Sequence, residues 1–209
     1  MRRHARSARP SELKDEKLYG QGLERSEFDF CSICLLAIPF PIDDNCSFKN
    51  CCLKLVCNGC IDAMHKRGLH GSCPFCRSPA AGNDEVSLGR IQKRVAARDP
   101  QGLYYLGCAY FHGQYGLEQN QSRAFELWNE AAEIGSKKAL CKVGFAYYDG
   151  NRGLSHDKAK GIRCLELAAT QGCVESRTKL GLVEYDNGNH DRALRHFMIS
   201  AKMGEKVFT

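Results

Sequence analysis

The stretch that decides the fold is residues 99–135, DPQGLYYLGCAYFHGQYGLEQNQSRAFELWNEAAEIG. Several of its short motifs return 37 residues later, and one returns a second time at the same spacing. The recurrences are Leu106-Gly107 as Val143-Gly144 and Leu180-Gly181, Tyr110 as Tyr147, Gly116-Leu117 as Gly153-Leu154, Ala131-Ala132 as Ala168-Ala169, and Gly135 as Gly172. A period of this length is typical of a helical solenoid, in which each repeat stacks on its neighbours.

Each repeat has room for two helices. We expect the first helices over 102–112, 137–148 and 174–186, and the second over 120–134, 157–170 and 189–202. The third unit is shorter, because Asp186-Asn187-Gly188-Asn189 replaces the Gly-Leu loop. Trp128, Leu165 and Phe197 each lie three residues before a pair of small residues, on the face expected to pack inward. A leading helix over 86–98 should precede the array, and Asp99-Pro100 offers an N-cap and a first-turn proline for the next helix.

These residues resemble the Sel-one-like repeat family, relatives of the tetratricopeptide repeats. The resemblance covers residues 98 to 204, close to three units. It implies a right-handed solenoid that binds a protein substrate or adaptor, and it implies no chemistry. A solenoid normally ends in a polar capping helix, and none is visible in the five residues after Gly204, so we expect that either the chain is a fragment of a longer array or its last face meets a partner.

Cysteine is the anomaly of the composition. The chain has 13 cysteines, and nine of them lie between Cys31 and Cys76. Met1–Pro10 contains four arginines and no apolar run, so we expect no secretory signal, and no stretch of about 18 apolar residues predicts a membrane span. We therefore expect an intracellular protein, cytoplasmic or nuclear, whose clustered cysteines bind metal rather than form disulfides.

Eight of the clustered cysteines form four pairs, the number that two tetrahedral zinc ions require. The pairs are Cys31 with Cys34, Cys51 with Cys52, Cys57 with Cys60, and Cys73 with Cys76. Soft thiolates in fours favour zinc over magnesium or calcium. We favour Cys51 as the third ligand, and Cys46 is the alternative. A segment this short has little core, so two zinc ions should supply much of its stability.

The order of the pairs resembles a RING finger of the all-cysteine type, particularly in the closing Cys73-Pro-Phe-Cys76-Arg77. The resemblance implies interleaved sites, one with Cys31, Cys34, Cys57 and Cys60, the other with Cys51, Cys52, Cys73 and Cys76. The adjacent pair Cys51-Cys52 departs from the usual pattern, which spaces these two ligands. RING fingers recruit a ubiquitin-charged conjugating enzyme, and the residues that match the family's contact surface are Ile33, Met64 and Pro74. Arg77 matches the basic residue that orients the ubiquitin conjugate.

Two hypotheses follow. The protein is a RING-type ubiquitin ligase whose repeats select the substrate, or it is a non-catalytic zinc-finger and repeat scaffold. Phosphoinositide binding is less favoured because Ser47-Phe48-Lys49-Asn50 holds a single lysine, and nucleic-acid binding is less favoured despite a net charge of +6. We expect surface or packing roles for His65 and His70, and buried, structural thiols at Cys108, Cys141, Cys164 and Cys173.

The predicted fold is mainly α, with a small zinc-stabilised module followed by an α-helical solenoid. We expect a disordered basic tail over 1–27, the zinc finger over 28–80, a linker and leading helix over 81–97, and about three repeats over 98–209.

Overall fold

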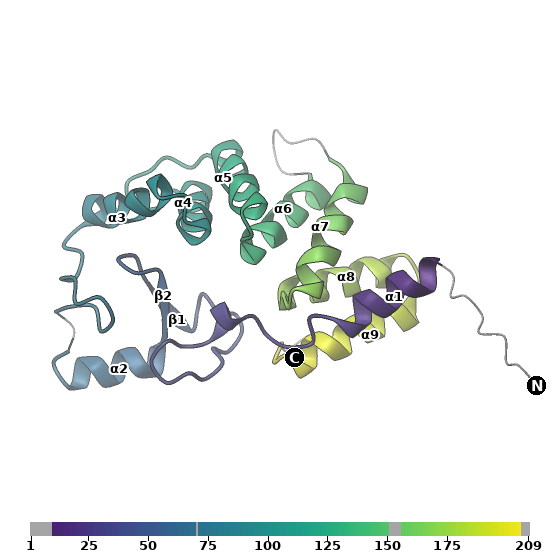
Figure 1. The fold of residues 1–209 in the computed structure, drawn as a ribbon, viewed down its shortest axis with the longest axis horizontal. Helices are drawn as coiled ribbons and strands as arrows, with labels where there is room; N and C mark the ends of the chain where they lie inside the picture. Colours follow the sequence, from purple (N-terminus) through teal and green to yellow (C-terminus); the bar gives the residue numbers. More distant parts are fainter. Residues whose placement is uncertain (1–9, 70, 151–155, 206–209) are drawn as a thin grey trace, which may run out of the picture.

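The computed structural model describes residues 10–69, 71–150 and 156–205. A small cysteine-rich module is followed by an array of paired helices (Figure 1). The helices of the array are α3 (Asp84–Ala96), α4 (Pro100–His112), α5 (Gln121–Glu133), α6 (Lys137–Asp149), α7 (Lys158–Thr170), α8 (Val174–Asp186) and α9 (His190–Lys202). Each expected helix is present with its ends within two residues of the prediction, which confirms the mainly helical fold class.

Capping side chains set where α4 to α7 begin, and they recur from one repeat to the next. The Asp99 carboxylate accepts from the Gln101 N–H at 2.9 Å, as predicted for the start of α4. The side chains of Asn120 and Asp157, at the same position in successive repeats, cap α5 and α7. Because a side-chain oxygen satisfies an otherwise unpaired N–H, each cap fixes where its helix begins. The Gly153-Leu154 recurrence lies outside the described residues.

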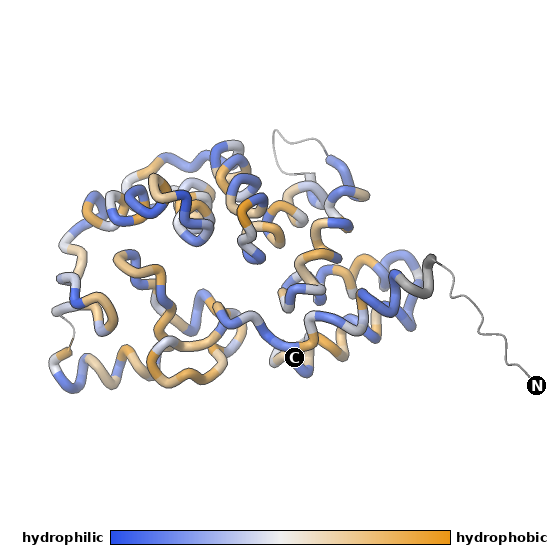
Figure 2. The backbone as a smooth tube through the Cα atoms, in the orientation of Figure 1, coloured by the Kyte–Doolittle hydropathy of each residue, from blue (hydrophilic) through white to orange (hydrophobic). Residues whose placement is uncertain are grey.

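Glycine allows the two helices of each repeat to approach closely. A Cβ on Gly107 would lie 2.5 Å from the Trp128 indole nitrogen, and Gly144 and Gly181 face Leu165 and Phe197 in the same way. Trp128 and Leu165 are buried as expected, whereas Phe197 is half-buried. The colours of Figure 2 alternate along the helices, as expected when one face of each helix is buried.

The module is built on a two-stranded antiparallel sheet. Strand β1 (Cys46–Lys49) pairs with β2 (Lys54–Cys57), and α2 (Asn58–Lys66) follows directly. A short 3-10 helix, η1 (Glu27–Asp29), precedes the module. The buried core is small, with Ile38, Ile42, Leu55 and Val56 as its aliphatic members, so apolar burial alone contributes little stability here.

The expectation of a disordered tail is wrong for residues 10–27; residues 1–9 lie outside the described part of the chain. Helix α1 (Pro10–Gly20) packs on the far end of the array, where Lys14 pairs with Glu166 at 3.0 Å and Tyr19 contacts His196 at 3.3 Å. Leu18 is buried there. The segment has few apolar residues, but the surface it needs comes from helices more than a hundred residues away.

The module and residues 20–30, here called the arm, lie inside the arc that α3 to α9 form (Figure 1). They contact the first helix of each pair. Phe48 stacks on Tyr105 of α4 with ring centroids 3.5 Å apart, and Asp29 pairs with Lys138 of α6 at 3.4 Å. Arg177 of α8 donates to the Gln21 carbonyl. The protein therefore covers part of the inner surface of its own array. Among the described residues, no helix combines the length and apolarity that crossing a bilayer requires.

Candidate metal centres

The cysteine side chains of the module converge in two groups of four. One group is Cys31, Cys34, Cys57 and Cys60, and the other is Cys51, Cys52, Cys73 and Cys76. Within each group the sulfur atoms all lie within 4.8 Å of one another, with Cys34 Sγ 3.8 Å from Cys57 Sγ and Cys52 Sγ 3.6 Å from Cys73 Sγ. Four sulfurs bound tetrahedrally at 2.3 Å from zinc lie about 3.8 Å apart. Each group can therefore hold one metal ion.

The two groups interleave along the chain, as the resemblance implied. The sheet and α2 separate them, because Cys57 and Cys60 stand where β2 passes into α2, while Cys51 and Cys52 lie in the turn between the strands. Cys46 lies outside both groups and pairs across the sheet with Cys57. The structure thus brings together the eight cysteines predicted as ligands, and it places Cys46, the alternative ligand, outside both groups. Their binding of zinc remains a prediction.

The two flanking Cys-x2-Cys loops have the same backbone geometry. In the first, the Cys31 N–H donates to the Leu36 carbonyl and the Leu35 N–H donates back to the Cys31 carbonyl, both at 2.9 Å. The second loop repeats this pattern. The Cys73 N–H donates to the Ser78 carbonyl at 2.8 Å, and the Arg77 N–H donates to the Cys73 carbonyl at 3.0 Å. Two segments of unlike sequence share one turn that aims two sulfurs in one direction. This shared turn is the geometry that a two-cysteine metal half-site needs.

Three of the cysteine loops end on a strained residue. Leu35, Leu53 and Arg77 each follow the second cysteine of a pair, and their φ angles are 59°, 58° and 58°. The left-handed conformation costs a bulky residue about 1–2 kcal/mol, so it persists only where surrounding interactions enforce it. This strain could not be predicted from the sequence, because glycine, the residue that usually marks a left-handed conformation, occupies none of the three positions. Four bonds to a common ion would enforce it.

Hydrogen bonds and burial shift the pKa values of the two groups differently. Burial opposes ionisation of Cys31, but the N–H groups of Cys57 and Ile33 donate to its sulfur and lower its pKa to about 6. Burial and the contact with Cys73 raise the pKa of Cys52 to about 11. A metal that binds the second group must therefore displace protons.

Three of the four predicted partner-binding residues line one groove. Ile33, Met64 and Pro74 come from the first cysteine loop, from α2 and from the last cysteine loop, and with Leu69 and Phe75 they border a groove of about 550 Å³. Ile33 is 40% exposed. Arg77 is exposed and does not line the groove. His65 is exposed on α2, and His70 lies outside the described residues.

The cysteines of the repeats show one feature that sequence reasoning missed. Cys141 and Cys173 are buried as expected, while Cys108 and Cys164 are half-buried. Cys141 and Cys173 also converge with Glu175. Cys173 and Glu175 lie 32 and 34 residues after Cys141 in the sequence, so only the stacking of the repeats brings the three side chains together.

Comparison with known proteins identifies the repeats. Residues 100–136 and 137–173 match the family model of the Sel1 repeat. A Sel1 repeat protein from Oxalobacter formigenes has a similar crystal structure, with a TM-score of 0.53 and 23% identity over 71% of this chain. The chain spans 58% of that protein. A protective antigen of uropathogenic Escherichia coli strains, which displays an SLR fold, matches with a TM-score of 0.37 and 19% identity over 70% of this chain and 38% of its own.

The curated proteins gave no match. Helices α8 and α9 continue the pattern of paired helices beyond the two matched repeats. The chain therefore carries Sel1 repeats in a mainly helical array, preceded by a small cysteine-rich module with two four-cysteine groups that can bind metal.

Proposed function

We propose that this protein is a protein-interaction scaffold whose cysteine-rich module is folded by two zinc ions. The presence of Sel1 repeats carries this proposal, because helical repeats stack into extended surfaces that bind other proteins. The cysteine groups support it, since four thiolates saturate a tetrahedral zinc ion and leave no position for a reacting water. When bound, zinc would supply folding energy to a module whose apolar core is small.

The partner is expected on the outside of the array, because the arm and the module already contact α4, α6 and α8. Exposed apolar side chains gather on the last two helices. Leu194 and Met198 lie one turn apart on α9 and are 57% and 53% exposed, and Leu182 and Tyr185 are similarly placed on α8. Large exposed apolar side chains at helical spacing are typical of protein-binding faces.

Binding partners of the full chain, captured by cross-linking and identified by mass spectrometry, test this proposal. We expect the double substitution Leu194→Asp and Met198→Asp to remove partners that the wild-type chain retains. Val86→Asp, at an exposed apolar position on α3, is the matched control and should leave them in place. Identical partner sets for all three proteins would contradict the proposed surface.

A ubiquitin ligase is the second candidate, and the groove is the observation that favours it. Ile33, Met64 and Pro74 match the conjugating-enzyme surface of RING fingers, and all three border the same apolar depression. In this account the module binds a ubiquitin-charged conjugating enzyme, and Arg77 holds the flexible conjugate in a reactive orientation, a gain in rate from positioning alone.

Ubiquitin-chain assembly by the purified, zinc-loaded chain with a panel of conjugating enzymes distinguishes the two candidates. The ligase predicts chains that Ile33→Ala abolishes and that Leu36→Ala leaves intact, since Leu36 is 69% exposed but lies outside the groove. The scaffold predicts no chains with any enzyme of the panel.

A further inference from the structure

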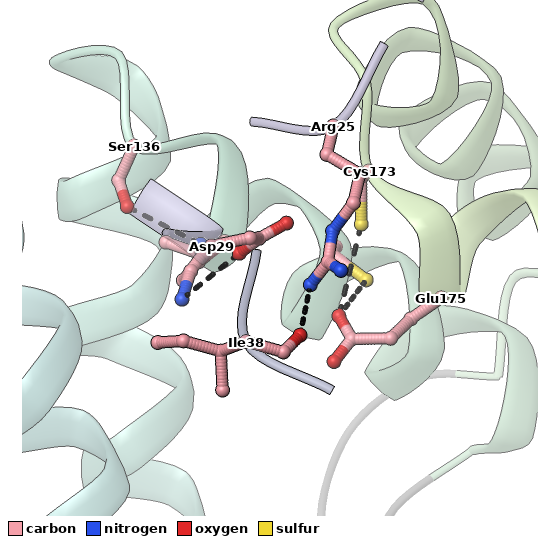
Figure 3. A network of polar contacts seen from close by, with 9 residues as sticks. Arg25, Asp29, Ile38, Ser136, Cys173 and Glu175 are labelled. Carbon is pink, nitrogen blue, oxygen red and sulfur yellow. Dashed lines mark hydrogen bonds and ion pairs between the residues drawn. The ribbon is translucent and has the colours of Figure 1, made fainter. Parts of the chain in front are cut away.

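The strongest unassigned feature lies between the second and third helix pairs of the array. Cys141 lies on α6, Cys173 occupies the N-cap position of α8 without a capping hydrogen bond, and Glu175 lies in the first turn of α8. The Glu175 carboxylate lies 3.9 Å from Cys141 Sγ and 3.8 Å from Cys173 Sγ, and the three ligand atoms all lie within 4.8 Å of one another. Both contacts are made by the same carboxylate oxygen, Oε2, and Figure 3 shows the Cys173 side chain beside the Glu175 carboxylate.

We propose that Cys141, Cys173 and Glu175 form a third metal site, which takes a divalent cation with an affinity for thiolate, such as zinc or cadmium. The spacing of its ligand atoms resembles that of the two cysteine groups in the module, where sulfurs lie 3.6–3.8 Å apart. Two thiolates and one carboxylate are a mixed donor set suited to zinc. Three protein ligands leave the fourth tetrahedral position for water or a partner's side chain.

The surroundings balance the charge of such a site. Two thiolates, one carboxylate and a divalent ion sum to one negative charge, and Lys142 stands next to Cys141 in the sequence and is half-buried. Lys142 lines the same small cavity as Cys173 and Glu175. The occupied site would therefore be close to neutral, which lowers the cost of burying it.

Proton release accompanies binding. The contact with Cys173 and burial hold the pKa of Cys141 well above its usual range, so the Cys141 sulfur carries a proton in the empty site. Occupancy forms two metal–sulfur bonds and one metal–oxygen bond, and the two thiol protons pass to solvent. The Ser176 hydroxyl, 3.2 Å from Cys173 Sγ, can donate to the resulting thiolate.

The position of the site gives it a structural consequence. The ion would join α6 to α8 across the junction between two repeats, directly beside the arm. Gly172 precedes Cys173, and a Cβ there would lie 2.4 Å from the Glu24 carbonyl, so the arm passes over the site. Figure 3 shows Arg25 of the arm close to Cys173 and Glu175, where its guanidinium donates to the Ile38 carbonyl at 2.6 Å. Metal occupancy would thus fix the geometry of the surface on which the arm rests.

Native mass spectrometry of the full chain, titrated with Cd²⁺ alone, tests the site. We expect three ions on the wild type, two on Cys141→Ser and on Cys173→Ser, and three on Cys164→Ser, which removes a half-buried cysteine of the array outside the cluster. Glu175 is exposed, so Glu175→Gln should fold normally and bind the third ion at least roughly tenfold more weakly.

Alkylation provides a second readout that does not depend on variants. In the wild type, Cd²⁺ should protect Cys141 and Cys173 from a small alkylating reagent and leave Cys164 unchanged. Only two ions on the wild type, or a third ion that survives Cys141→Ser, would overturn the site. A Cys141–Cys173 disulfide that forms with peroxide while no third ion binds would also overturn it.

Discussion

Gly107→Ala tests the close helix packing on which the repeat array depends. The added methyl group would lie 2.5 Å from Trp128 Nε1, so the indole must move by roughly 1 Å to restore normal contact. Trp128 is 4% exposed and donates to the Tyr104 carbonyl at 3.2 Å. Overpacking costs about 1–3 kcal/mol, and a broken buried hydrogen bond costs a further 1–3 kcal/mol or so. Alanine returns about 1 kcal/mol of helix propensity.

The expected net loss in the free energy of unfolding is about 1–5 kcal/mol. Urea unfolding of the metal-loaded chain measures it, and fluorescence is a direct probe because Trp128 is the single tryptophan. Gly89→Ala is the matched control, since Gly89 lies in α3 with nothing within 4 Å of an added Cβ. It should gain up to about 1 kcal/mol. A Gly107→Ala chain as stable as the Gly89→Ala chain would refute the packing argument.

Three further predictions concern the arm, the buried histidine and the metal. Gly22→Ala should detach α1 and speed amide exchange there, because Gly22 has a φ of +61° and an added Cβ would overlap the Ala169 carbonyl. Gly20→Ala is the control, and it should leave α1 docked because the space around Gly20 is open. Burial and the charges of Arg177 and Arg192 lower the pKa of His196 to about 3. In the unfolded chain the histidine takes up a proton near pH 6.5, whereas in the folded chain it stays neutral. The free energy of unfolding should therefore fall by about 2 kcal/mol between pH 7 and pH 5, and the His196→Gln variant should lose less over this range. Chelation should abolish amide protection in β1, β2 and α2 but preserve most of the helical circular dichroism, because the main apolar core of the array, around Leu103 and Trp128, contains none of the eight module cysteines.

The helical array was predictable because its signals are local and repeated. The 37-residue period predicted that Gly107 and Gly144 occupy equivalent positions in the first helix of each repeat, and Asp99 predicted where α4 begins. Three of the four cysteine pairs could also be predicted as half-sites, since two residues between cysteines permit one tight turn. Spacing alone left Cys46 and Cys51 open as ligands, and the register of the β1–β2 pair separates them, with Cys46 opposite Cys57.

The remaining features depend on contacts between distant parts of the chain. Tyr19 and His196 are 177 residues apart, and neither residue indicates that α1 will dock on α9. The left-handed conformations of Leu35 and Arg77 follow from the shared cysteine-loop turn and leave no mark on residue type. The convergence of Cys141 with Cys173 depends on the stacking angle between repeats, which the period does not specify.

The central claim is that two interleaved four-cysteine groups hold the module around two metal ions. The most direct measurement is the zinc content of the full chain by native mass spectrometry, compared among the wild type, Cys51→Ser and Cys46→Ser. We predict one ion fewer on Cys51→Ser and an unchanged number on Cys46→Ser. An ion lost from Cys46→Ser, or a full complement on Cys51→Ser, would contradict it.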